Sequence, residues 1–157
     1  MTGFVSWDAT LAADLIRPRR QLPGATLPIL HAIQDTFGYV DDQAIPLIAD
    51  ALNISRAEVV GVIHFYHDFR QQPPGRHILR LCRAEACQSM GCDGLADRVR
   101  DQLGVDFGET TADGAVTLEA VYCLGNCALS PAAMLDGRII GRVDPARAEQ
   151  LLAEAQA

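Results

Sequence analysis

The apolar residues in the first part of the chain recur at three- and four-residue spacing, the period of an α-helix. The clearest run contains Leu27, Leu30, Ile33 and Phe37, and Gly38 follows it as a typical helix stop. Thr26 stands before this run in the place of an N-cap residue. The spacing therefore predicts a helix that begins at Thr26 and ends before Gly38.

Three further helices are predicted around this one. A short amphipathic stretch covers residues 6–16, and Asp41 is expected to cap a helix that ends near Leu52. Ser55 and Glu58 form a capping box, because each side chain can bond the other residue's amide, and a buried stripe through Tyr66 is expected to follow. Short helices with tight connections predict a helical bundle over residues 1–72.

The spacing of the apolar residues changes after residues 71–75, where Pro-Pro-Gly prevents a helix from continuing. Residues 77–81 and 117–122 are expected to be strands, and 93–103 is expected to be a helix. Asp136-Gly137 between two short apolar runs predicts a hairpin. Asp144-Pro145 then opens a last helix. This order predicts a second part over residues 76–157 with one sheet in an α/β layer.

Composition and charge exclude several functions. The 157 residues carry a net charge of −7 without a basic stripe, which argues against a nucleic-acid partner. No apolar run approaches the ~18 residues of a membrane span. Residues 1–20 also lack the basic and then apolar order of a secretory signal. We therefore expect a cytoplasmic protein without a membrane span.

The candidate chemistry lies in four of the five cysteines. Cys82 and Cys87 have four residues between them, Cys123 and Cys127 have three, and each pair follows a predicted strand. Cytosolic thiols are kept reduced, which disfavours disulfides. A thioredoxin-type dithiol would need a Cys-x-x-Cys pair, and a catalytic cysteine would need a nearby base. The spacing favours a [2Fe–2S] cluster, and structural zinc in a non-redox adaptor stays open as the alternative.

The cysteine motifs resemble the thioredoxin-like [2Fe–2S] ferredoxin family. The resemblance rests on residues 82–91, on residues 123–131, and on the helical segments 27–40 and 62–69. It implies a thioredoxin-like domain in which Cys82, Cys87, Cys123 and Cys127 bind the cluster. Cys92 departs from the family pattern and is excluded as a ligand, because a small apolar residue at a helix start explains it.

The family includes the small iron–sulfur subunit of the NADH-oxidising module of respiratory complex I and its counterparts in NAD-linked hydrogenases and formate dehydrogenases. Residues 81–91 are most similar to the gamma subunit of the soluble, molybdenum-containing NAD-dependent formate dehydrogenase. The resemblance implies an electron-transfer subunit without a catalytic site of its own. Its expected partners are an FMN- and NAD(H)-binding flavoprotein subunit and a molybdopterin-bearing catalytic subunit. A [2Fe–2S] cluster moves single electrons, so a flavin must convert hydride chemistry into one-electron steps.

Overall fold

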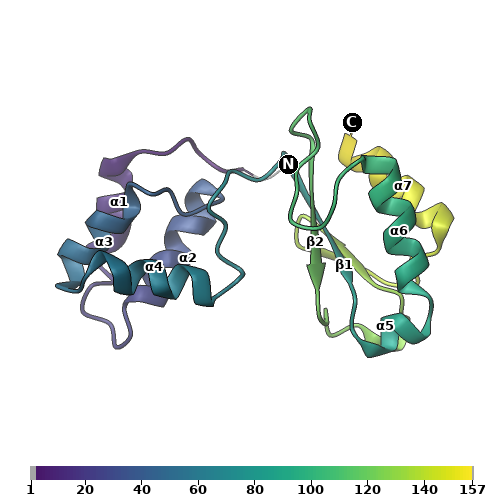
Figure 1. The fold of residues 1–157 in the computed structure, drawn as a ribbon, viewed down its shortest axis with the longest axis horizontal. Coiled ribbons are helices and arrows are strands. Elements are labelled where there is room, and N and C mark those ends of the chain that lie inside the picture. Colours follow the sequence, from purple (N-terminus) through teal and green to yellow (C-terminus); the bar gives the residue numbers. More distant parts are fainter. Residues whose placement is uncertain (1–2, 157) are drawn as a thin grey trace. The chain divides into compact units, whose positions relative to one another are not determined.

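A computed structural model of the chain describes residues 3–156 and separates them into two compact units (Figure 1). One unit is Gly3–Pro73, and the other begins at Pro74. The division falls inside the Pro-Pro-Gly segment that the sequence indicates as a boundary. The predicted domain limits, a helical bundle over 1–72 and a thioredoxin-like domain over 76–157, stay a prediction. Residues 1, 2 and 157 of those ranges lie outside the described residues.

Four helices form the first unit around one apolar core. They are α1 (Ala9–Ile16), α2 (Thr26–Phe37), α3 (Ala44–Leu52) and α4 (Arg56–Phe65). The core contains side chains from all four, among them Ile16, Ile29, Leu30, Ile33, Phe37, Ile48, Val59 and Ile63. Apolar side chains at helical spacing thus turn one face of each helix to a shared interior.

The helix ends test the predicted caps. Gly38 ends α2 in the left-handed conformation at φ 84°, and Ser55 and Glu58 form the predicted capping box at the start of α4. The prediction for Thr26 is wrong, because Thr26 is the first residue of α2 and Ala25 precedes it without a side-chain cap. Asp41 does not cap α3 either. Its carboxylate accepts a hydrogen bond from the Gln43 amide at 2.8 Å in the turn before the helix.

Two further limits differ from the sequence-based expectation. The first helix begins at Ala9 rather than at residue 6, because Asp8 caps it by accepting the Leu11 amide at 2.8 Å. Tyr66 lies beyond the end of α4 and is 43% exposed, so it does not belong to the buried stripe. The hydrophobic period alone does not show where a helix ends when no glycine or proline marks the position.

The second unit contains a four-stranded sheet in the order β2-β1-β3-β4. Its strands are β1 (His77–Cys82), β2 (Val116–Val121), β3 (Ala133–Leu135) and β4 (Arg138–Ile140). β1 and β2 are parallel, whereas β3 is antiparallel to both of its neighbours. In the parallel pair His77 lies opposite Val116, and Cys82 lies opposite Val121, so both strands end at the same edge.

Two long helices pack on this sheet and close the second core. α6 (Cys92–Leu103) connects β1 to β2, and α7 (Pro145–Gln156) follows the hairpin, with the two helices side by side (Figure 1). The core joins alternate residues of the strands to the apolar faces of both helices, including Leu79, Leu81, Leu95, Val99, Val116, Leu118, Leu151 and Leu152. The sequence did not predict α5 (Glu85–Ser89), a five-residue helix between β1 and α6.

Asp136 and Gly137 form the predicted two-residue turn between β3 and β4. Both have positive φ, 49° and 86°, as this turn type requires. The Asp136 carboxylate also holds the start of β1, because it accepts the Ile78 amide at 2.9 Å and contacts His77 Nδ1 at 2.6 Å. One acidic residue therefore joins the hairpin to the neighbouring strand.

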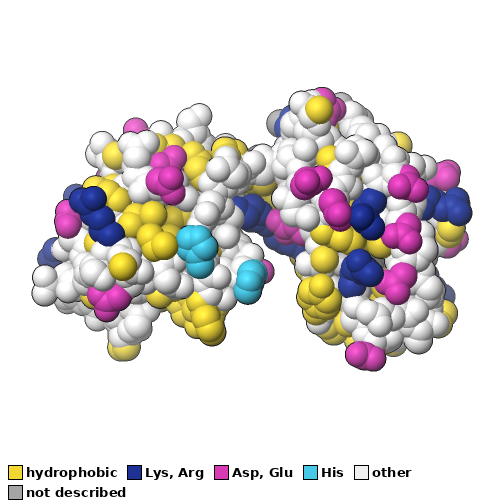
Figure 2. Space-filling view, in the orientation of Figure 1, with side chains coloured by type: hydrophobic (Ala, Val, Ile, Leu, Met, Phe, Trp, Pro, Cys, Tyr) yellow, Lys and Arg dark blue, Asp and Glu magenta, His cyan; other side chains and the backbone are white. Residues whose placement is uncertain are grey.

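Two surface properties bear on function. None of the described helices has the length and apolar character needed to cross a membrane. Hydrophobic side chains gather over the end of the second unit at which β1 and β2 terminate (Figure 2). Tyr122, just after β2, is 79% exposed there.

We predict that Asp136→Asn lowers the free energy of unfolding at neutral pH by about 1–2 kcal/mol. Burial pushes the pKa of Asp136 up, but the Ile78 amide and His77 outweigh it, so the pKa lies below its ordinary value. A carboxylate of this kind stabilises the fold above its unfolded pKa and loses that effect as the pH falls through its folded pKa. The difference between wild type and variant should therefore shrink in acid. Denaturant unfolding across that pH range measures it.

The control is Asp50→Asn, which changes an exposed carboxylate of α3 and should shift stability by less than about 0.5 kcal/mol. A destabilisation of Asp136→Asn that stays constant from neutral to acid pH would contradict the role given to the carboxylate charge.

Candidate metal centre

The four cysteines predicted as ligands lie at the edge where β1 and β2 end. Cys82 is the last residue of β1, and Cys87 is in α5. Cys123 follows β2 by two residues, and Cys127 begins a short 3-10 helix, Cys127–Leu129. Because the two strands are parallel and in register, the loops that follow them meet at one place.

The thiols are arranged as two pairs, and all five cysteines of the chain are free of disulfides. Cys123 Sγ and Cys127 Sγ are 3.7 Å apart. Two sulfurs on one tetrahedral metal at ~2.3 Å would be separated by about this distance. The Cys82 and Cys87 thiols lie close enough for each to shift the pKa of the other. Among residues 3–156, no three His, Cys, Asp or Glu side chains surround a single point as ligands of one metal ion.

Hydrogen bonds connect the loop of one pair with the loop of the other. The amide of Leu124, which lies between Cys123 and Cys127, donates to the Cys82 sulfur. From the segment after Cys127, the hydroxyl of Ser130 is 3.5 Å from Cys87 Sγ. The Ala132 amide also donates to Cys87. The position of each buried sulfur is therefore set by residues of the opposite loop.

Backbone amides surround the sulfurs, which is a suitable environment for negative charge. The Ala84 amide donates to Cys82, and the Gly125 amide donates to Cys123 Sγ at 3.3 Å. The Leu124 amide also donates to Cys82, and the Ala132 amide donates to Cys87. Backbone amides therefore interact with three of the four sulfurs. Such donors stabilise thiolates and the additional negative charge of a reduced metal cluster. The donor set of the chain therefore fits the [2Fe–2S] cluster that the sequence predicts.

The loop between Cys123 and Cys127 has a strained backbone. Cys123 has φ 126°, which is unusual for any residue except glycine, and Gly125 has φ 74°. Strained backbone of this kind is found preferentially at functional sites, where surrounding contacts hold it in place. Here it turns the Gly125 amide back toward the Cys123 sulfur.

The surroundings of Cys82, Cys87 and Cys127 shift the pKa values of their thiols. Burial and the hydrogen bond to Cys87 raise the pKa of Cys82. Burial would also raise the pKa of Cys87, but its hydrogen-bonding contacts with Ser130, Cys82 and the Ala132 amide hold that pKa below the ordinary value. The hydrogen bond with Cys123 and the charge of that neighbour raise the pKa of Cys127. Metal binding must displace the protons that these thiols retain, so metal affinity should increase with pH.

The site is buried on one side and open on the other. Cys82 and Cys87 are buried, whereas Cys123 and Cys127 are exposed. One pair is sheltered from water, and the other is accessible to a partner.

Cys92 lies beside the buried thiols of Cys82 and Cys87. It begins α6 and is buried in an apolar cluster with Cys82, Cys87 and Ala132. Burial, together with the negative charge of Asp93, raises the pKa of its thiol to about 11. Cys92 is therefore a neutral, apolar side chain at a helix start, which is the role that the sequence indicates.

Two arginines near the site have different partners. Arg80 forms an ion pair with Glu119 of β2 at 2.7 Å. Arg83, directly after Cys82, pairs with Asp93 at 2.7 Å, and its guanidinium lies 5.3 Å from the centre of the Phe107 ring. These contacts keep the charge of Arg83 close to the first cysteine loop, where a cation favours electron uptake by an anionic cluster.

Sequence reasoning found all four candidate cysteines and missed the groups that hold them. Leu124, Ser130 and Ala132 interact with sulfurs of the opposite pair, and the sequence shows only that they lie near a cysteine. The small residues in both loops were the available signal, because small side chains allow amides to approach sulfur.

Comparison with known proteins places these features in a family. Residues 12–156 match the family described as "Thioredoxin-like [2Fe-2S] ferredoxin". A subunit of the NADH-quinone oxidoreductase of Pseudomonas aeruginosa is 41% identical over 128 residues, which cover 82% of this chain and 77% of that protein. The HndA subunit of the NADP-reducing hydrogenase of Solidesulfovibrio fructosivorans is 33% identical over 134 residues, which cover 85% and 78%.

A solved structure has the same fold. It is the crystal structure of an NAD+-reducing [NiFe]-hydrogenase in the air-oxidized state, with a TM-score of 0.73 and 28% sequence identity. The match covers 88% of this chain and 24% of the hydrogenase chain. This chain thus corresponds to about a quarter of that longer polypeptide.

We predict that Cys92→Ala retains the predicted cluster and that Cys87→Ala loses it. The contacts of Cys87 lower its thiol pKa, whereas burial in an apolar environment raises the thiol pKa of Cys92. Both residues are buried, so the two variants remove similar side chains and control for each other. Visible absorbance per chain after iron and sulfide reconstitution is the measurement. Loss of the absorbance in Cys92→Ala, with retention in Cys87→Ala, would show that Cys92 is the ligand and Cys87 is not.

Proposed function

The chain belongs to the thioredoxin-like [2Fe–2S] ferredoxin family, and from this premise we propose that it is the electron-transfer subunit of an NAD-linked, multi-subunit oxidoreductase. Its cofactor is a [2Fe–2S] cluster, so the cofactor prediction is confirmed. When bound, the cluster accepts and releases one electron at a time.

We propose that Cys82 and Cys87 bind one iron and that Cys123 and Cys127 bind the other. The observation that carries this assignment is the arrangement of the thiols as two pairs at one sheet edge, with one pair separated by 3.7 Å. A [2Fe–2S] cluster takes two protein ligands on each iron, whereas a structural zinc ion takes all four around one point. The pairing supports the iron–sulfur assignment over the zinc-stabilised adaptor.

The surrounding residues have separate tasks. Amides of Ala84, Leu124, Gly125 and Ala132 stabilise charge on the sulfurs. Ser130 joins the two loops, because its hydroxyl contacts Cys87 and donates to the Cys127 carbonyl at 2.8 Å. The exposed pair gives the short route by which electrons would enter and leave. The described residues provide no nucleophile–base pair, and substrate chemistry is assigned to partner subunits.

The partner that this function requires is a flavoprotein with FMN and an NAD(H) site, because hydride chemistry must be divided into single electrons. Relatives that are subunits of NADH-quinone oxidoreductase and of an NADP-reducing hydrogenase support such a partner. A complex that exchanges electrons with the cellular NAD(H) pool would lie in the cytoplasm.

The finer assignment is an NAD-dependent formate dehydrogenase with a molybdopterin catalytic subunit. Residues 81–91 support it, because their resemblance is to the gamma subunit of that enzyme. The two relatives from Pseudomonas aeruginosa and Solidesulfovibrio fructosivorans support the equivalent subunit of complex I or of an NAD-linked hydrogenase as the second candidate. The subunits that co-purify with the chain distinguish the two: a molybdopterin protein for the first, and a quinone-reducing or nickel-containing protein for the second.

The proposed function predicts that the cluster is reduced by NADH only when the flavoprotein subunit is present. A [2Fe–2S] cluster takes up single electrons and cannot accept a hydride, so NADH alone should leave the oxidised absorbance unchanged. NADH with the co-purified FMN subunit should bleach it and produce the paramagnetic signal of a reduced [2Fe–2S] cluster. Optical and electron paramagnetic resonance spectra of the same samples measure both changes, and dithionite serves as the positive control.

Reduction by NADH without the FMN subunit would contradict the need for a flavin partner. A colourless, zinc-containing protein that dithionite does not change would replace the proposal with the adaptor.

A further inference from the structure

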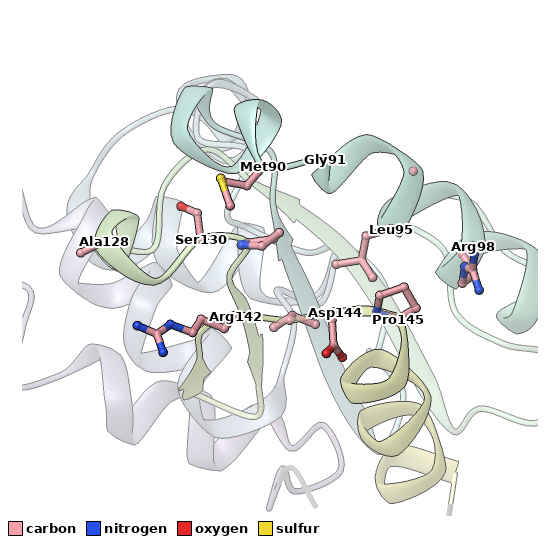
Figure 3. A pocket seen from close by; sticks show the side chains of 12 residues that line it. Met90, Gly91, Leu95, Arg98, Ala128, Ser130, Arg142, Asp144 and Pro145 are labelled. Atoms are coloured by element: carbon pink, nitrogen blue, oxygen red, sulfur yellow. The ribbon is translucent and has the colours of Figure 1, made fainter.

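A pocket of about 670 Å³ lies directly beside the cysteine loops. It is formed where α6 and α7 begin and where the chain passes Ser130 and Pro131 (Figure 3). Ser130 belongs to both features, because its hydroxyl is 3.5 Å from Cys87 Sγ and the residue also lines the pocket. An occupant of this pocket would thus contact the segment that holds a candidate cluster ligand.

The interior of the pocket is apolar. Leu95 and Val143 are buried in the core of the second unit and line the pocket together with Pro131 and Pro145. Met90 lies at the rim and is 61% exposed. A flexible, exposed methionine beside an apolar hollow is typical of a surface that adapts to a protein side chain.

Two arginines give the rim a positive charge. Arg98 on α6 and Arg142 before α7 stand at opposite sides of the pocket (Figure 3). Within residues 3–156, no carboxylate forms an ion pair with either of them. The one acid that lines the pocket is Asp144, and it accepts the Arg147 amide at 2.7 Å as the cap of α7. In a chain with a net charge of −7, this rim is a local site for negative charge.

The backbone at Arg142 strengthens this interpretation. Arg142 has φ 51°, a left-handed conformation that favours glycine or asparagine. Its amide donates to the Leu129 carbonyl, which fixes the residue to the loop after Cys127. The conformation does not itself require an arginine, and the Arg142 side chain is exposed at the pocket rim.

We propose that this pocket receives an acidic segment of the flavoprotein partner, with an apolar side chain inside and carboxylates on Arg98 and Arg142. The inference rests on the proposed function and adds the place and chemistry of docking. A small-molecule site usually has converging, buried polar groups. Here the charged groups are exposed and far apart around an apolar centre, which is the anatomy of a protein interface.

Gly94 offers a direct test, because it lines the pocket and a Cβ added there meets nothing within 4 Å. Gly94→Trp should fill the pocket without disturbing the fold, and Gln102→Trp, at an exposed position of the same helix outside the pocket, is its control. The probe is the purified FMN subunit that co-purifies with wild-type chain. We expect Gly94→Trp to bind it at least about tenfold more weakly and Gln102→Trp to bind it like wild type.

A second pair of variants tests the charge. Arg98→Glu with Arg142→Glu should weaken binding by about tenfold or more and reduce its dependence on salt. The control combines Arg76→Glu with Arg138→Glu, because these arginines lie outside the pocket, near the edge where β1 begins and β3 ends. The cluster absorbance of every variant, measured beside binding, shows that the fold and the site are intact.

The results separate this inference from the proposed function. If wild type binds the FMN subunit and both pocket variants bind it equally well, the docking site is wrong and the function stands. If Arg98→Glu with Arg142→Glu weakens binding while Gly94→Trp does not, the two arginines attract the partner through long-range charge, and no partner segment occupies the pocket. If wild-type chain with its cluster has no FMN partner, the proposed function fails and the docking site fails with it.

Discussion

The parallel pairing of β1 and β2 is the constraint on which the site depends. It ends both strands at one edge, with Cys82 opposite Val121, and so brings together two loops that are about forty residues apart in the chain. Hydrogen bonds across the loops then set the sulfurs: Leu124 reaches Cys82, and Ser130 contacts Cys87. A slip of one residue between the strands would turn every side chain of β2 to the other face and separate the two pairs.

The same arrangement divides the site into a protected half and an accessible half. The buried pair packs against apolar residues and Cys92, whereas the second pair lies on a strained, exposed loop. Electron carriers need both properties, because a sheltered cluster keeps its environment constant and an exposed edge allows exchange with a partner. The hydrophobic surface at this end of the unit and the arginine-rimmed pocket beside it lie where such exchange would occur.

Local signals in the sequence predicted much of the fold. The Asp136-Gly137 turn, the Ser55–Glu58 capping box and the Asp144-Pro145 helix start are set by residues a few positions apart, and the structure has all three. Thr26 failed as a cap because the buried Ala25 before it already has a helical backbone, so the helix includes Thr26. α5 was missed because five residues are too few to show a period. The four cysteines were identified from their spacing and resemblance, but the contacts across the loops depend on strand register and could not be read from either loop alone.

Metal and sulfide content per chain tests the central claim most directly, because it distinguishes a bridged two-iron centre from a single metal ion. Protein purified without oxygen and analysed for iron, zinc and acid-labile sulfide should contain about two irons and about two sulfides per chain, with no stoichiometric zinc. About one zinc per chain without sulfide would show that the four thiols surround one ion. That result would remove the electron-transfer role.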